Sequence, residues 1–108
     1  MEMDLGLEVF QLPGGELRFN PADPALLSRL EQLDQRLAEI DTTDLQELDR
    51  QAKAVLNWVL GPGNDVDKAL GGISLLAIGK NGRPVLQNLL DALTPVFREG
   101  IVRCAEQY

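Results

Sequence analysis

The chain has 108 residues, 44% of them hydrophobic and 25% charged, as is typical of a single globular domain spanning residues 1–108. Its formal net charge is −7. Because phosphate repels an acidic surface, nucleic acid is excluded as an expected partner. No apolar stretch approaches the ~20 residues that cross a bilayer, and the acidic N-terminus lacks a signal-peptide pattern, so no membrane partner is expected.

The charge is unevenly distributed along the chain. Residues 1–49 hold 12 acidic and 3 basic side chains, whereas residues 50–108 hold 5 acidic and 7 basic ones. Solvated helix faces explain this pattern in the simplest way. The alternative is that the acidic half attracts the other half of a second subunit, or steers a basic partner.

The first predicted element is a β-hairpin over residues 5–19. Apolar residues alternate on both sides of a turn formed by Pro13-Gly14-Gly15, and they are Leu5, Leu7 and Val9 before it and Leu17 and Phe19 after it. An isolated hairpin is marginal in water. It is therefore expected to cover the core of its own chain or, alternatively, to offer a free edge to another strand.

Two amphipathic helices are predicted next, over residues 24–40 and 44–60. Asp23 is a favourable N-cap and Pro24 suits the first helical position. Thr43 is expected to cap the second helix, with a glutamine three residues on as in a capping box. The apolar stripes are Leu26, Leu30, Leu33, Leu37 and Ile40, then Leu45, Leu48, Ala52, Val55 and Val59. The short connection predicts an antiparallel helical hairpin.

Two further helices are predicted over residues 64–70 and 84–104, with Asn64 as a cap of the first. Pro95 either kinks the last helix or begins a new one. The apolar run 73–78 is compatible with a buried helical turn or with a short strand. The expected fold is therefore mainly α within the α+β class: a small bundle of four to five helices preceded by the hairpin.

The sequence offers no equipment for catalysis. It contains no histidine and one cysteine, Cys104, which excludes a Ser-His-Asp constellation and a structural zinc site. The loop Gly79-Lys80-Asn81-Gly82 lacks the first glycine and the hydroxyl residue of a phosphate-binding loop. The carboxylates fall largely on polar helix faces. We therefore expect a binding protein that is not an enzyme, with no metal and no cofactor.

Two segments of the chain resemble motifs of a known protein family. Phe19-Asn20-Pro21-Ala22-Asp23-Pro24 is similar to the Phe-Asn-Pro-Ala-Asp-Pro entry into a leucine-rich helix in the small tail assembly chaperones of long-tailed, siphovirus-like bacteriophages and prophages. The segment 60–72, which begins Leu60-Gly61-Pro62-Gly63 and ends Leu70-Gly71-Gly72, is similar to that family's glycine-rich segment before the last helix. The resemblance spans roughly residues 5–99.

This resemblance implies a non-enzymatic chaperone that binds the tape measure protein in the cytoplasm of the bacterial host during tail assembly. It also implies self-association into homo-oligomers and, through a longer frameshifted form, recruitment of the tail tube protein. The alternative is a structural or adaptor subunit that remains in the phage virion.

An apolar cluster between flexible glycines is a candidate for self-association or partner binding. Its members are Val66, Leu70, Ile73, Leu75, Leu76 and Ile78. Burying one such side chain fully contributes ~1.5–3 kcal/mol, so leaving several exposed in a monomer is unfavourable. The alternative is that these residues fill the core of their own domain.

Overall fold

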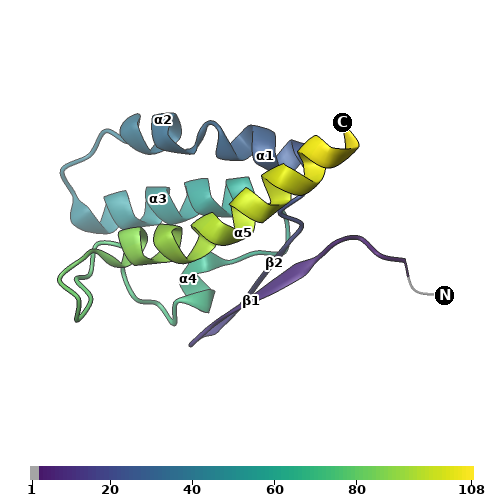
Figure 1. Ribbon diagram of the computed structural model, residues 1–108. Helices are drawn as coiled ribbons and strands as arrows, with labels where there is room; N and C mark the ends of the chain where they lie inside the picture. Colours follow the sequence, from purple (N-terminus) through teal and green to yellow (C-terminus); the bar gives the residue numbers. More distant parts are fainter. Residues whose placement is uncertain (1–2) are drawn as a thin grey trace.

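The computed structural model describes residues 3–108, and Figure 1 shows how its elements are arranged. In chain order they are β1 (Glu8–Leu12), β2 (Gly15–Phe19), α1 (Pro24–Leu30), α2 (Leu33–Ala38), α3 (Leu45–Leu60), α4 (Val66–Ala69) and α5 (Val85–Gln107). The predicted mainly helical α+β fold with an N-terminal hairpin is confirmed. No helix within the described residues is both long and apolar enough to span a membrane.

The hairpin covers the core with one face of β2. Leu12 pairs with Gly15, so Pro13 and Gly14 form the turn. Leu17 and Phe19 point inward and are buried, whereas Val9 lies on the outer face and is half exposed. The strand begins at Glu8 rather than Leu5, and the outer edge of β1 is unpaired within residues 3–108.

The predicted helix over residues 24–40 is two helices, α1 and α2, separated by a tight turn. The amide of Gln32 donates to the carbonyl oxygen of Arg29, three residues back rather than four. Each helix has its own contact with α3: Arg29 Nε donates to the Val59 carbonyl at 3.1 Å, and the Arg36 guanidinium lies 3.8 Å from the Trp58 ring centroid. The bend allows both helices to pack on α3.

Aspartates cap the next two helices in place of the predicted residues. Asp44, not Thr43, caps α3, and its carboxylate accepts the amides at positions 46 and 47. Asp65, not Asn64, caps α4. The Asn64 amide instead exchanges two hydrogen bonds with the backbone of Arg18, at 2.8 and 2.9 Å. Asn64 thus extends the β2 ladder to the loop after α3.

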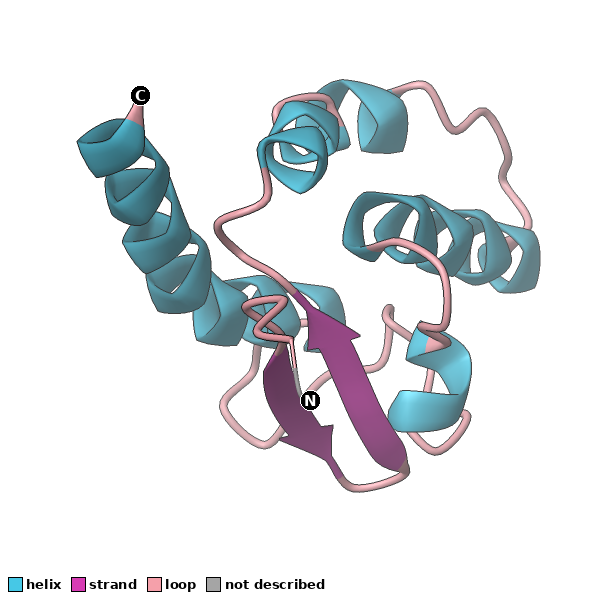
Figure 2. Ribbon diagram, turned by 90° about the vertical axis from the view of Figure 1, so that its right-hand side faces the viewer, coloured by secondary structure: helices cyan, strands magenta, loops and turns pink. Residues whose placement is uncertain are grey.

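The last helix, α5, is continuous and contains Pro95 in its interior. Pro84 precedes its first residue and does not begin it. Because proline lacks an N–H, it removes one helical hydrogen bond, and the Thr94 hydroxyl donates to the Leu90 carbonyl at 2.7 Å beside it. Figure 2 shows the helix bending along its length, with its C-terminal part standing beside the other helices.

The run 73–78 is neither a helical turn nor a regular strand. The Leu75 amide donates to the Asp49 carboxylate at 2.7 Å, and Ile78 forms an isolated bridge with Pro84. These two contacts tie the loop to α3 and to the start of α5. Leu75 itself is fully buried.

One hydrophobic core connects the hairpin with all the helices. Its buried residues are Leu17, Phe19, Leu26, Leu33, Ala52, Leu56, Val59, Leu60, Val66, Ala69, Leu70, Leu75, Leu89, Leu93 and Phe97. The rings of Phe19 and Phe97 lie 5.6 Å apart, so β2 meets the middle of α5 directly.

Candidate functional site

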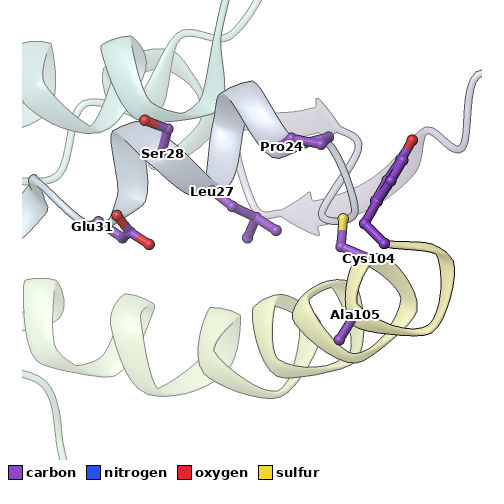
Figure 3. A pocket seen from close by; sticks show the side chains of 7 residues that line it. Pro24, Leu27, Ser28, Glu31, Cys104 and Ala105 are labelled. Atoms are coloured by element: carbon purple, nitrogen blue, oxygen red, sulfur yellow. The ribbon is translucent and has the colours of Figure 1, made fainter.

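A hollow of about 560 Å³ lies between α1 and the C-terminal end of α5. Pro24, Leu27, Ser28, Glu31, Cys104, Ala105 and Tyr108 line it. Figure 3 shows Leu27 and Glu31 on the side of α1 that faces α5, with Cys104 and Ala105 on the helix opposite. Most of this lining is apolar, and Tyr108 at its end is almost fully exposed.

A second hollow of about 330 Å³ lies further along the same pair of chain segments. It is lined by Leu30, Leu33, Asp34, Leu90, Thr94, Phe97, Arg98 and Ile101. Five of these eight residues are apolar, and one of them, Ile101, is 50% exposed. The two hollows follow each other between α1–α2 and α5, and we call them together the α1–α5 groove.

The spacing of residues along α5 explains why one helix face lines the whole groove. Groove residues recur from Leu90 to Tyr108 at intervals of three and four, which places them on one side of a helix. At ~1.5 Å per residue, this face is about 27 Å long. The opposite wall, formed by residues 24–34, is only about 15 Å long at the same rise, so the part of the groove with two walls matches about three turns of a second helix.

Two close contacts hold α5 in place along the groove. Gly100 packs on the backbone of Pro21, where an added Cβ would lie 1.8 Å from the carbonyl oxygen. One turn later, the Cys104 thiol donates to the carbonyl oxygen of Ala22 at 2.8 Å. The segment that joins the hairpin to α1 therefore fixes the position of both walls.

The charged side chains near the groove fall into two groups. Arg103 on α5 binds Glu99 at 2.9 Å and Glu8 at 3.4 Å, and the hydrogen bond that it donates to the Glu99 carboxylate raises the pKa of Arg103 above its ordinary value. The groove-lining charges Glu31, Asp34 and Arg98 are exposed.

The predicted self-association cluster is divided by the structure. Val66, Leu70 and Leu75 are buried in the core, so they are not available to a partner in the folded chain. Leu76 is half-buried. Ile73 and Ile78 are 52% and 64% exposed. Self-association through this region therefore stays a prediction for Ile73, Leu76 and Ile78.

A buried lysine connects α3 to α4. Lys53 Nζ lies 2.9 Å from Asp49 and 2.6 Å from Asp67. Burial favours a lower pKa for Lys53, but the bonds to Asp67 and Asp49 outweigh it and raise the pKa. Asp49 also accepts a hydrogen bond from the Leu75 amide, so this group links α3 to α4 and to the loop after α4.

Within residues 3–108, no group of three or more His, Cys, Asp or Glu side chains is placed to hold a metal ion. Comparisons with protein-family models, with curated proteins and with solved structures gave no match. The groove itself was not expected from the sequence. The sequence signal for the groove is that the apolar stripe of α5 continues past its buried residues to Ile101 and Tyr108.

Proposed function

We propose that this protein is a non-enzymatic tail assembly chaperone of a long-tailed bacteriophage or prophage, which holds an apolar helix of the tape measure protein in the α1–α5 groove. It acts in the cytoplasm of the bacterial host and self-associates, and a longer form recruits the tail tube protein. The resemblance in the segments 19–24 and 60–72 supports the family.

The observation that carries the proposal is the apolar groove between α1–α2 and α5. Leu27, Leu30 and Leu90 are only half-buried there, and Ile101 is half exposed. A helix laid between the two walls would cover these side chains, in the manner of other amphipathic helices that dock into grooves. Each apolar side chain removed from water would favour binding by up to ~1.5–3 kcal/mol.

Co-expression with the tape measure protein of the same phage tests the proposal. The wild-type chain should keep the long protein soluble and co-purify with it. Ile101→Asp places a charge on the groove face and should abolish co-purification. Val102→Asp is the matched control, because Val102 is the next residue, is 55% exposed and does not line the groove.

Equal co-purification of both variants would exclude the groove as the binding site. A separate measurement distinguishes a chaperone from a virion subunit. Mass spectrometry of purified virions should find the protein absent or scarce if it is a chaperone. Stoichiometric copies in the particle would support the structural or adaptor role instead.

A further inference from the structure

The two walls of the α1–α5 groove carry opposite charges that form no ion pair within the described residues 3–108. Glu31 and Asp34 stand on the α1–α2 wall, and Arg98 stands on the α5 wall. None of the three forms a salt bridge with any residue from 3 to 108, although Asp34 and Arg98 line the same hollow.

Three other charged side chains on α5, Asp91, Glu99 and Arg103, have ion-pair partners within residues 3–108, whereas Glu106, which does not line the groove, forms no salt bridge there. Arg103 binds Glu99 and Glu8, and Asp91 binds Arg83 at 2.8 Å. The unpaired charges that line the groove are therefore acidic on the α1–α2 wall and basic on the α5 wall. A ligand that fills the groove brings its own side chains beside them and excludes water, so a matched charge is favoured and a like charge is penalised.

We propose that the groove selects an amphipathic helix whose apolar stripe is flanked by Lys or Arg on the side facing α1–α2. This inference rests on the proposed function and specifies the chemistry of the segment that is bound. Glu31 and Asp34 are three residues apart on one wall. Glu31 follows the last residue of α1 and Asp34 lies in the first turn of α2, so basic residues on that flank of the partner helix would face both carboxylates.

The same asymmetry fixes the direction of the bound helix. Turning an amphipathic helix end for end while its apolar stripe stays in the groove moves its flanking charges to the opposite wall. The basic flank would then lie beside Arg98 instead of Glu31 and Asp34. The acidic character of residues 1–49 adds a long-range attraction for the same kind of partner.

Two synthetic peptides of about 18 residues, long enough to fill the groove, test the inference. They share one leucine stripe and differ only in whether the residues on one flank are Lys or Glu. Fluorescence anisotropy should give a Kd roughly three- to tenfold lower for the Lys peptide at low salt. The difference should shrink at about 1 M salt, where the screening length is about 3 Å.

The double variant Glu31→Lys, Asp34→Lys should reverse the preference between the two peptides. The variant Glu39→Lys, Asp41→Lys is the matched control, because it moves the net charge from −7 to −3 in the same way but lies outside the groove lining. Circular dichroism confirms that each variant is folded. The control should keep the wild-type preference for Lys.

The outcomes separate this inference from the proposed function. If both peptides bind equally, or if the control loses its preference as well, the charge selection is wrong and groove binding stands. If neither peptide binds, both proposals are overturned. If the Glu31→Lys, Asp34→Lys variant changes the sedimentation coefficient of the protein alone, the groove is filled by a second copy and the inference is also overturned.

Discussion

Gly100 of α5 lies directly against the carbonyl group of Pro21, in the segment that joins the hairpin to α1. A Cβ built at Gly100 would stand 1.8 Å from that oxygen and 2.3 Å from the carbonyl carbon. Both atoms belong to the backbone, and Pro21 is among the most deeply buried residues. Only glycine allows the two walls of the groove to approach each other here.

Gly100→Ala should therefore destabilise the protein and move α5 away from α1. In a helix interior, alanine is normally more favourable than glycine by about 1 kcal/mol. A loss of stability in Gly100→Ala would therefore indicate the close contact with Pro21. We expect the free energy of unfolding in urea to fall by about 1–3 kcal/mol, as in other overpacked sites. Glu106→Ala, an exposed change on the same helix, should have little effect. A more stable Gly100→Ala variant would show that the close contact does not exist.

Lys53 links α3 to α4 through Asp49 and Asp67, and its side chain is only 6% exposed. Lys53→Met keeps the apolar stem but leaves the half-buried Asp49 without its cation. Urea unfolding should show a loss of about 1–3 kcal/mol. Lys68→Met provides the comparison at an exposed lysine. An unchanged free energy of unfolding in Lys53→Met would mean that the attraction within the ion pairs only balances the cost of removing their charges from water.

The stability should depend on pH through Asp49. Burial favours a higher pKa for this carboxyl, but the Leu75 amide and Lys53 more than offset it and hold the pKa below its ordinary value of 3.8. A carboxyl whose pKa is lowered by folding stabilises the folded state at any pH above its pKa in the unfolded chain. This contribution is lost as the pH falls through the pKa of the folded state. Wild-type stability should thus fall below about pH 4 more steeply than that of Asp49→Asn. Parallel pH profiles would contradict the assignment.

Variants in the loop after α4 should affect folding and self-association separately. Leu75 is fully buried, so Leu75→Ser should unfold the monomer or cost several kcal/mol, about 2–5 by analogy with Leu→Ala changes. The double variant Ile73→Ser, Ile78→Ser removes exposed side chains and should leave the urea midpoint nearly unchanged. Sedimentation velocity should show that it forms smaller oligomers than the wild type. Identical sedimentation of the two proteins would exclude Ile73 and Ile78 from the self-association surface.

Local patterns in the sequence predicted most elements of the fold, because short-range geometry decides them. The Pro13-Gly14 turn, the Asp23 cap and the apolar stripes of the helices belong to this group. The division of residues 24–40 was not predictable in the same way. The apolar stripe from Leu26 to Ile40 continues through the break between α1 and α2. The break accompanies contacts of Arg29 and Arg36 with α3, and the spacing of residues in the sequence does not predict such contacts.

The sequence also did not predict which residues of the run 73–78 are buried. Ile73 and Leu75 are similar in hydropathy, yet one is half exposed and the other fully buried, because the Asp49 carboxylate fixes the loop at the Leu75 amide. The groove also depends on contacts between distant segments. The position of its walls depends on the close contact of Gly100 with Pro21 and on the hydrogen bond from Cys104 to Ala22. No sequence pattern indicates that either pair of residues is in contact.

Photo-crosslinking from adjacent positions on α5 tests most directly the proposal that the α1–α5 groove holds a helix of the tape measure protein. A benzophenone amino acid is placed at Ile101, which lines the groove, or at Val102, which does not. Each variant is then irradiated in cells that co-express the tape measure protein. We expect a covalent adduct with that protein from position 101 and little or none from position 102. Equal adducts from both positions, or an adduct from position 102 alone, would contradict the proposal.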